Sequence, residues 1–343
     1  MVVIKLHTKI LYENEISIAA KILNNGGIVG IPTETVYGLA ANALDGNAVK
    51  KIFKAKERPM DNPLIVHISS IDEIYNLVYH FPNIAKKLCD KFWPGPLTII
   101  LPKSNKIPNE VSAGLDTVAI RLPSHPLARK LIKTAGIPLA APSANISGKP
   151  SPTSFKHVYH DLNGKIDAII DGGDSSVGLE STVITLVSNP PKLLRPGGIT
   201  IEEVQAVLGT IDVDSAVFDK LRDGQTAISP GMKYKHYSPN ANIIILNCSS
   251  KKYIEYVNKK SAKNVAALCY DEDTPFLNVK TISMGSNLDV EEQANKLFNS
   301  LREIDKDDTI DTVYSRCPIQ EGVGIAVYNR LIRAAGFEVI NIE

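Results

Sequence analysis

Cysteine is scarce in this sequence, and long apolar runs are absent from it. The 343 residues include only Cys89, Cys248, Cys269 and Cys317, which are widely spaced and form no Cys-x-x-Cys pair. Because structural zinc sites usually carry closely spaced cysteines, we expect none, and we expect a reducing, cytoplasmic setting. No run of about 20 apolar residues offers a membrane-spanning helix. The segment after Met1 also lacks the basic and apolar regions of a signal peptide, so we expect no membrane association.

A strong charge of either sign is missing as well. The 38 lysines and arginines nearly balance the 37 aspartates and glutamates, which leaves a formal net charge of +1. Such a balance provides no overall field that attracts nucleic acid, and we expect no stable nucleic-acid binding. Apolar residues, in contrast, make up 44% of the chain. A chain of this length and composition can bury a large core, and it predicts two domains.

Apolar segments alternate with amphipathic ones over residues 1–210. Glu13 to Asn25 has apolar residues at helical spacing and is followed by two glycines, which predicts a helix that ends there. Ala48 to Lys56 predicts another helix. Segments rich in Ile, Val and Leu predict strands at 28–31, 64–68, 97–101, 118–122, 138–141, 168–170 and 183–187. The alternation predicts an α/β fold with a twisted, mixed sheet in this first domain.

A segment rich in proline and polar aromatic residues follows at residues 211–240. It contains Tyr234, His236 and Tyr237, whose side chains are common in binding sites. We therefore predict a linker that contacts the functional site, with a plain spacer as the alternative. The pattern then restarts and predicts a small βα, Rossmann-like domain with a parallel sheet over residues 241–343. Its expected strands are 243–246, 265–268 and 312–314, and its expected helices are 290–304 and 325–335.

Three cations, Lys54, Lys56 and Arg58, lie where a predicted helix ends and a strand begins. Pro59 stops the helix, because its ring clashes with the preceding turn and it has no amide donor. Alternate residues cannot share one helix face. A helix that unwinds at this point can nevertheless bring Lys56 and Arg58 together to bind a polyphosphate. The alternative is a solvated helix end, where the macrodipole favours cations.

Two polar loops follow predicted strands, which is where α/β proteins place their ligands. Pro32 to Leu39 carries threonine hydroxyls and a glycine, although such threonines can also serve local backbone bonding alone. Pro142 to Ser151 carries Ser143 and Asn145, together with Ser151 itself, as candidate donors to phosphate or ribose oxygens. This second loop lacks the glycine spacing and the Gly-Lys-Ser/Thr ending of a P-loop.

Single arginines end two further apolar segments, at Arg121 and Arg195. An arginine in such a place needs an anionic partner, either a ligand carboxylate or an internal Asp or Glu. Ser181 belongs to another hydroxyl cluster beside a predicted strand. His157 and His160 form a His-x-x-His pair, but no further ligands are near them in the sequence, and we predict no metal site there.

Taken together, these segments resemble the YrdC-like family of threonylcarbamoyl-AMP synthases, in its two-domain form. The resemblance covers nearly the whole chain and includes the Pro-Gly-Met-Lys-Tyr-Lys-His-Tyr-Ser-Pro linker. The other motifs that match in order and spacing are Lys56-Glu57-Arg58-Pro59, Pro142-Ser143-Ala144-Asn145, Gly178-Leu179-Glu180-Ser181-Thr182 and Leu194-Arg195-Pro196-Gly197.

The resemblance implies a nucleotidyltransferase. Such an enzyme joins L-threonine, bicarbonate or CO2, and ATP into L-threonylcarbamoyladenylate and releases pyrophosphate. The product would serve the threonylcarbamoyl modification of the tRNA adenosine beside the anticodon, through a downstream tRNA threonylcarbamoyl transferase. Mg2+ is expected with ATP, held largely by the phosphates and water rather than by protein metal ligands.

The resemblance also assigns site residues by motif position. Lys56 and Arg58 would be catalytic, because they would neutralise the phosphates. L-Threonine would contact Thr35, His67, Arg121, Ala141 and Ser181. ATP would contact Arg58, Asn62, Thr117, Ser143, Asn145, Ser151, Arg195 and Tyr237. The segment from Tyr234 to Tyr237 would cover the site and exclude water from a hydrolysis-prone product.

Two other functions stay open from the sequence. One is a double-stranded RNA or tRNA-binding module, which the near-zero net charge and the lack of a basic stripe disfavour. The other is a carbamoyltransferase that acts on carbamoyl phosphate. That function would bring zinc-finger-like cysteine clusters, which this sequence does not have.

Overall fold

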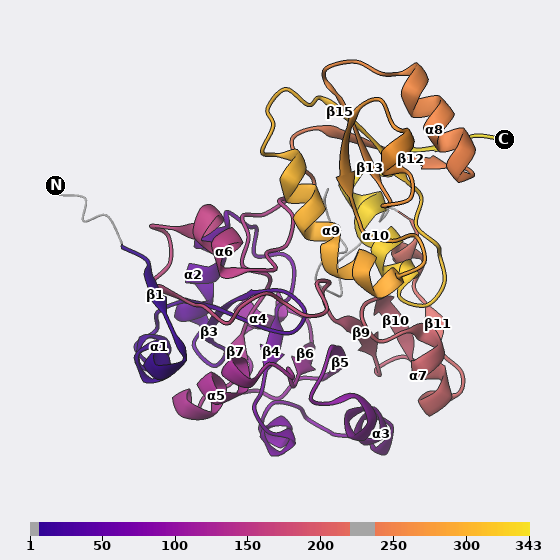
Figure 1. The fold of residues 1–343 in the computed structure, drawn as a ribbon. Coiled ribbons are helices and arrows are strands. Elements are labelled where there is room, and N and C mark those ends of the chain that lie inside the picture. Colours follow the sequence, from indigo (N-terminus) through magenta and orange to yellow (C-terminus); the bar gives the residue numbers. More distant parts are fainter. Residues whose placement is uncertain (1–6, 220–236) are drawn as a thin grey trace.

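The molecule contains two β-sheets, and each is covered by helices (Figure 1). The structure is a computed structural model, and it describes residues 7–219 and 237–343. We call residues 7–219 the N-terminal unit and residues 237–343 the C-terminal unit. The N-terminal unit has an eleven-stranded sheet in the order β1-β8-β2-β3-β7-β4-β6-β5-β9-β10-β11. Because this sheet contains parallel and antiparallel neighbours, the predicted mixed α/β fold is confirmed.

The elements of the N-terminal unit are short. Its strands are β1 (Lys9–Leu11), β2 (Val29–Ile31), β3 (Gly38–Asn42), β4 (Ile65–His67), β5 (Leu97–Pro102), β6 (Thr117–Arg121), β7 (Leu139–Ala140), β8 (Ala168–Ile170), β9 (Thr182–Thr185), β10 (Lys192–Arg195) and β11 (Asp212–Val213). Its helices are α1 (Ile16–Asn24), α2 (Gly46–Lys56), α3 (Asn83–Phe92), α4 (Asn109–Ser112), α5 (Pro126–Ala135), α6 (Phe155–Leu162) and α7 (Ile201–Leu208). Single 3-10 turns lie at Glu13–Glu15, Ile71–Asn76 and Ser215–Val217.

Helix α2 shows how the sequence sets the ends of an element that matters for the site. Asp45 caps its start, because the carboxylate accepts hydrogen bonds from the N–H groups of Asn47 and Ala48. This cap begins the helix two residues before the predicted start. The helix ends as predicted at Lys56, where Glu57 takes a left-handed conformation with φ 54°. The chain reverses there and continues toward Arg58.

Two expectations about the N-terminal unit need correction. The segment Pro32 to Leu39 is not wholly a loop, because β3 begins at Gly38 and pairs antiparallel with β2. The alanines of β3 have little β-propensity, so the sequence pattern did not reveal this strand. The expected linker over 211–240 also begins too early. Asp212 and Val213 form β11, which pairs parallel with β10, so the sheet extends past residue 210. Tyr234 and His236 lie outside the described residues.

The C-terminal unit is built on a five-stranded parallel sheet in the order β14-β13-β15-β12-β16. The sequence predicted a parallel sheet and three of these strands, but it did not predict β14 and β16. Its strands are β12 (Asn242–Asn247), β13 (Val265–Cys269), β14 (Lys280–Ser283), β15 (Thr312–Arg316) and β16 (Val339–Asn341). Its helices are α8 (Ser250–Lys259), α9 (Val290–Ile304) and α10 (Gly324–Ala334), and a 3-10 turn lies at Thr274–Phe276. No helix in either described range is long and apolar enough to cross a membrane.

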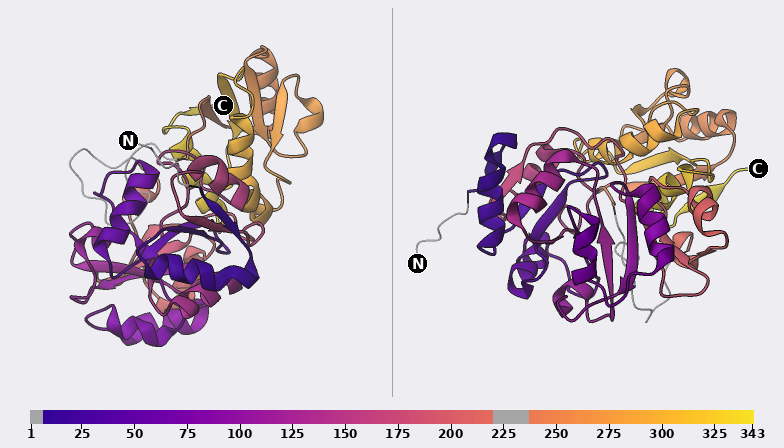
Figure 2. Two further views of the ribbon diagram at one scale, coloured as in Figure 1. Left: turned by 90° about the vertical axis from the view of Figure 1, so that its left-hand side faces the viewer. Right: turned by 90° about the horizontal axis from the view of Figure 1, so that it is seen from below.

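Helices α9 and α10 face the N-terminal unit, whereas α8 lies on the other side of the C-terminal sheet (Figure 1). The left view of Figure 2 shows the C-terminal unit, in orange and yellow, at one end of the molecule. The hydrophobic core around α9 and α10 also includes Val36 and Leu179 of the N-terminal unit. The apolar interior is therefore continuous between the two units at this point.

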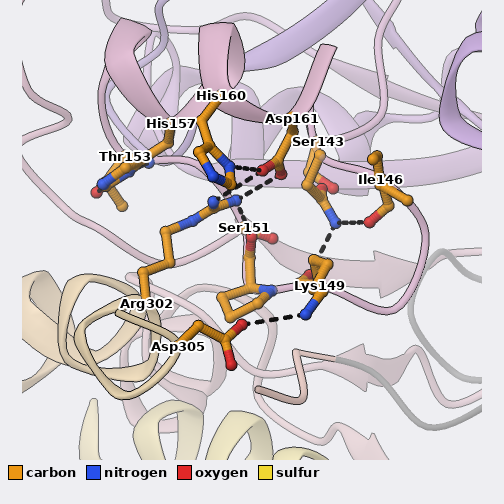
Figure 3. A network of polar contacts seen from close by, with 12 residues as sticks. Ser143, Ile146, Lys149, Ser151, Thr153, His157, His160, Asp161, Arg302 and Asp305 are labelled. Atoms are coloured by element: carbon orange, nitrogen blue, oxygen red, sulfur yellow. Dashed lines mark hydrogen bonds and ion pairs between the residues drawn. The ribbon is translucent and has the colours of Figure 1, made fainter. Parts of the chain in front are cut away.

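Polar contacts join the same two surfaces (Figure 3). Arg302 of α9 forms an ion pair with Asp161 of α6 at 2.8 Å and donates to the Pro150 carbonyl at 2.6 Å. Lys149 forms an ion pair with Asp305 at 3.1 Å. The C-terminal unit thus holds the loop that ends at Ser151 through both its backbone and a side chain.

Gly178 lies where the backbones of the two units come close together. It has φ +79°, and a Cβ built on it would lie 2.4 Å from Asn295 Cα in α9. Gly173 has nearly the same backbone conformation, with φ +77°, but a Cβ there would meet nothing within 4 Å. The pair separates backbone strain from loss of the docking contact.

We expect Gly178→Ala to lower the free energy of unfolding by at least about 2 kcal/mol more than Gly173→Ala, because only the first pushes backbone against backbone. Both variants carry the left-handed strain of an alanine, about 1–2 kcal/mol. Chemical denaturation of the two variants and the wild-type chain measures the difference. Equal losses would show that α9 does not constrain Gly178.

Candidate functional site

One cavity collects most of the predicted site residues. It lies mainly in the N-terminal unit and is partly open to solvent. Its lining residues are Thr33, Thr35, Val36, Gly38, Lys56, Arg58, Ile65, His67, Arg121, Ala141, Pro142, Ser143, Asn145, Ser147, Gly148, Glu180, Ser181, Arg195 and Tyr237. A cavity with several convergent polar groups is typical of a small-molecule site.

The ends of several strands position these residues. His67 and Arg121 are the last residues of the parallel strands β4 and β6, and they are partners in the strand register. Arg195 ends β10, and Ser181 directly precedes β9. These candidate residues therefore lie at strand ends, where α/β proteins place their ligands.

Lys56 lines the cavity and is buried, with 2% of its surface exposed. Its Nζ donates to the carbonyl oxygens of Ser143 at 2.5 Å and Asn145 at 2.6 Å. The Lys56 carbonyl in turn accepts from the Ser147 N–H. Burial, followed by the nearby Arg58 charge, lowers the pKa of Lys56 well below its usual range. Lys56 thus holds the 143–147 loop through the hydrogen bonds that its Nζ donates.

Arg58 lies beyond the reversal at Glu57 and lines the same cavity as Lys56. Its Nη2 donates to the Asn62 carbonyl at 3.1 Å, and the guanidinium lies 5.7 Å from the centre of the Phe53 ring. Burial lowers the pKa of Arg58 to about 10, so it remains charged at neutral pH. The structure therefore does bring the two junction cations together. Lys54 is exposed on α2, in keeping with a solvated position.

Arg121 lines the cavity from within a buried polar cluster. Its Nη2 forms an ion pair with Glu34 at 2.7 Å, its Nη1 donates to Thr35 Oγ1 at 2.8 Å, and its Nε donates to the Gly95 carbonyl at 3.2 Å. Burial alone would raise the pKa of Glu34, but the Arg121 charge and hydrogen bond bring it below its usual value. An internal carboxylate is therefore the partner of Arg121, which was one of the two possibilities that the sequence left open.

His67 lies beside this cluster and carries no charge at neutral pH. Burial, followed by the Arg121 charge, lowers the pKa of His67 to about 3. Its Nδ1 lies 3.2 Å from the Ile65 carbonyl. The positive charge beside His67 consequently comes from Arg121 and not from the imidazole.

Ser181 and Arg195 form a bonded group in the cavity wall. Arg195 donates from Nε to the Ser181 carbonyl at 3.0 Å and from Nη2 to Ser181 Oγ at 3.1 Å. Ser181 Oγ also contacts Thr98 Oγ1 at 2.7 Å. Burial lowers the pKa of Arg195 to about 10, so this guanidinium also stays charged.

Tyr237 is the first described residue after position 219, and its side chain lines the cavity. It is buried, has φ 64° and packs against Phe298 of α9, with 5.1 Å between the ring centroids. The next residue, Ser238, donates its N–H to the Gly148 carbonyl at 2.9 Å. The end of the expected linker therefore lies against the cavity loop.

Three predicted ATP contacts do not line this cavity, namely Asn62, Thr117 and Ser151. Asn62 is buried and orients Arg58 through its carbonyl. Thr117 begins β6 and pairs with Pro102. Ser151 is fully buried, and its Oγ donates to Glu180 Oε1 at 2.5 Å.

Sequence reasoning missed the two carboxylates of the site, Glu34 and Glu180. Both lie inside segments that carry other candidate residues, and the need of Arg121 for an anionic partner was the available signal for Glu34. No group of three or more possible metal-ligating side chains occurs within residues 7–219 and 237–343. The His160 Nδ1 instead pairs with Asp161 at 3.0 Å (Figure 3).

Two protein-family models match this chain, and together they cover most of its length. The model of a family labelled Sua5, YciO and YrdC, described as telomere recombination, matches residues 21–197. A second, described as threonylcarbamoyl-AMP synthase, C-terminal domain, matches residues 199–336.

Relatives match nearly the full length. A threonylcarbamoyl-AMP synthase of Pyrococcus abyssi is 47% identical over 339 residues, which cover 96% of each chain. One of Bacillus subtilis is 46% identical over 330 residues, which cover 95% of this chain and 94% of the relative. The crystal structure of P. abyssi Sua5 complexed with L-threonine aligns with a TM-score of 0.90 and 46% identity, over 98% of this chain and 100% of that chain.

We expect Lys56→Met to lower the free energy of unfolding by about 1–3 kcal/mol, because two buried carbonyl groups lose their donor. It should also weaken ATP binding, since the 143–147 loop loses its anchor. Lys54→Met, two residues earlier on the exposed face of the same helix, is the control and should change the free energy of unfolding by less than about 0.5 kcal/mol. Calorimetric titration with ATP and chemical denaturation measure both effects. Comparable results for the two variants would contradict a role for the buried ammonium.

We expect His67 to make the chain less stable in mild acid. Below pH 6.5 the unfolded chain protonates this histidine, whereas the folded chain keeps it neutral down to about pH 3. The free energy of unfolding should therefore fall by about 1.4 kcal/mol per pH unit below 6.5, in addition to other titrations. Denaturation at pH 7 and pH 5 should show a loss in the wild-type chain about 2 kcal/mol larger than in His67→Gln. Equal losses in the two proteins would show that His67 titrates normally.

Proposed function

The chain belongs to the Sua5, YciO and YrdC family of threonylcarbamoyl-AMP synthases, and from this premise we propose how its described residues perform the reaction. It synthesises L-threonylcarbamoyladenylate from L-threonine, bicarbonate or CO2, and ATP, and it releases pyrophosphate. The observation that carries the proposal is a single cavity that is lined by Arg121 among hydroxyl groups and also by Lys56, Arg58 and Arg195. We assign the part around Arg121 to an amino acid and the part around Arg58 to a polyphosphate, and we call these parts the two ends of the cavity.

L-Threonine occupies the end with Arg121 in this proposal. Three contacts among the described residues account for three of the five N–H groups of this guanidinium, so it retains N–H groups for a carboxylate. Ala141 donates its own N–H to the Ile65 carbonyl, so its carbonyl is the group that it can offer to the amine. Thr35, His67 and Ser181 complete this end. The complex of P. abyssi Sua5 with L-threonine supports this choice of ligand.

ATP occupies the end with Arg58, Arg195 and the 143–148 loop. Arg58 offers a planar fork to the phosphate oxygens, and Lys56 adds a buried positive charge while it holds the loop. Ser143 and Asn145 line the cavity from this loop, and Tyr237 lines it from the C-terminal unit. Asn62, Thr117 and Ser151 then act from behind the cavity wall rather than by direct contact.

The chemistry needs position and charge more than a strong acid or base. The threonine amine combines with CO2 as a carbamate, and a carbamate oxygen attacks the α-phosphorus in line while pyrophosphate leaves. The cations stabilise the charge that develops on the phosphate oxygens. Mg2+ enters as part of the MgATP substrate. The two carboxylates at the cavity are already paired, Glu34 with Arg121 and Glu180 with Ser151. Neither is presented as a free metal ligand.

The product is handed on rather than used at this site. We propose that a downstream tRNA threonylcarbamoyl transferase accepts the adenylate for modification of the adenosine beside the anticodon. The chain itself needs no tRNA contact for its own step, and a formal net charge of +1 gives it no general attraction to nucleic acid. Binding of tRNA as the main function is therefore not favoured.

We expect pyrophosphate release from ATP to require both L-threonine and bicarbonate. Within that assay, Arg121→Lys should raise the KM for L-threonine by about tenfold or more, because lysine keeps the charge for Glu34 but loses the fork. The KM for ATP should change by less than about threefold. Arg129→Lys, at an exposed position on α5, is the matched control.

Pyrophosphate release that ignores L-threonine would reject the function. A threonine-dependent reaction in which Arg121→Lys changes only the KM for ATP would instead reverse the assignment of the two ends.

A further inference from the structure

A short segment of the N-terminal unit lies between the cavity and the C-terminal unit. In the segment from Gly178 to Ser181, Glu180 and Ser181 line the cavity, whereas Leu179 belongs to the core around α9 and α10. Gly178 lies against the backbone of α9 at Asn295. The position of this part of the cavity wall therefore depends on the C-terminal unit.

Glu180 is the charged member of this segment, and its main partner comes from the C-terminal unit. It is buried, with 7% of its surface exposed, and Oε2 accepts from Arg330 Nε at 2.8 Å. Arg330 lies on α10 and has no exposed surface. Its Nη2 also reaches the Glu180 carbonyl at 3.3 Å, and its Nη1 donates to Asn329 Oδ1 at 2.8 Å.

The other oxygen of Glu180 connects this pair to the predicted nucleotide residues. Oε1 accepts from Ser151 Oγ at 2.5 Å, and Glu180 directly precedes Ser181, to which Arg195 is bonded. Burial alone would raise the pKa of Glu180, but the charges of Arg330 and Arg195 bring it below its usual value. The carboxylate is therefore ionised in the wall of a cavity that takes a triphosphate.

A negative charge in that wall opposes ATP unless it is compensated. Arg330 supplies the compensation, because its guanidinium is fully buried and bonded to Glu180 at two points. Removing one member of a buried pair leaves an uncompensated charge, which is far more costly than removing both. Loss of Arg330 should thus act on the nucleotide through Glu180.

We propose that Arg330 is a positioning residue for ATP, and that it acts from the C-terminal unit by neutralising and orienting Glu180 in the cavity wall. The proposal rests on the assignment of ATP to the end of the cavity with Arg58 and Arg195. It gives helix α10 a specific part in the reaction, although this helix contributes no residue to the cavity lining.

A simple docking contact would leave a different signature. If Arg330 only held the two units together, its loss would lower stability and affect both substrates alike. Neutralising Glu180 as well would then restore stability and affect the KM values of both substrates alike. An electrostatic role through Glu180 predicts a selective effect on ATP and a rescue in the double variant.

The experiment compares Arg330→Met, Glu180→Gln/Arg330→Met and Arg316→Met in the full chain. Arg316 is the matched control, because it forms a buried pair with Asp273 at 2.9 Å inside the C-terminal unit and does not touch the cavity. The KM for ATP and the KM for L-threonine are measured by pyrophosphate release. The midpoint of thermal unfolding is recorded for each protein.

We expect Arg330→Met to raise the KM for ATP by about tenfold or more and the KM for L-threonine by less than about threefold. The double variant should return the KM for ATP to within about threefold of the wild-type value. Arg316→Met should lower the unfolding midpoint without changing either KM. If Arg330→Met does not fold, Arg330→Lys replaces it, with a smaller rise in the KM for ATP that Glu180→Gln again reverses.

An unchanged KM for ATP in Arg330→Met, an equal rise for both substrates, or a double variant no better than the single one would overturn the proposal. A wild-type chain whose pyrophosphate release ignores L-threonine would reject the function itself, which is a separate outcome.

Discussion

Burial of charge around one cavity is the constraint on which this structure depends. Lys56, Arg121 and Arg195 are all largely removed from water, and so are Glu34 and Glu180. A buried ion is tolerated only when it is paired or fully hydrogen-bonded. Each of these side chains accordingly has a partner that comes from a distant part of the chain, and those pairings hold the loops and strand ends in their relative positions.

The partners also divide the cavity into two kinds of surface. Around Arg121 an acidic side chain and hydroxyl groups surround the guanidinium, which suits a small zwitterion. Lys56 donates to backbone carbonyl groups of the 143–147 loop, and Arg58 donates to the carbonyl of Asn62. Because two basic side chains lie together there, this end suits a polyanion. Buried charged side chains with different partners thus provide binding surfaces for two different substrates in one cavity.

The sequence predicted the elements better than it predicted the pairs. Strand 168–170 and helix 290–304 match the structure residue for residue, because their apolar periodicity is strong and their ends are clear. Strand β3 escaped notice because its alanines pack well only once β2 and β7 lie on either side. The local pattern marked Lys56 and Arg121 as candidate binding residues, although it left a solvated helix end open for Lys56. The sequence could not predict the pair between Glu180 and Arg330, because 150 residues separate them and neither local segment indicates its partner.

The shared interior of the two units has a consequence for how the protein is made. Synthesis proceeds from the N-terminus, and early segments begin to fold before later ones emerge. At that stage Leu179 lacks the apolar side chains of α9 and α10, and Glu180 lacks its ion-pair partner Arg330. Both contacts can form only after α9 and α10 have been synthesised. The last third of the chain therefore completes the cavity wall whose residues belong to the first two thirds. A nascent chain that stops before α10 carries the Glu180 carboxylate without Arg330, beside the place where ATP should bind.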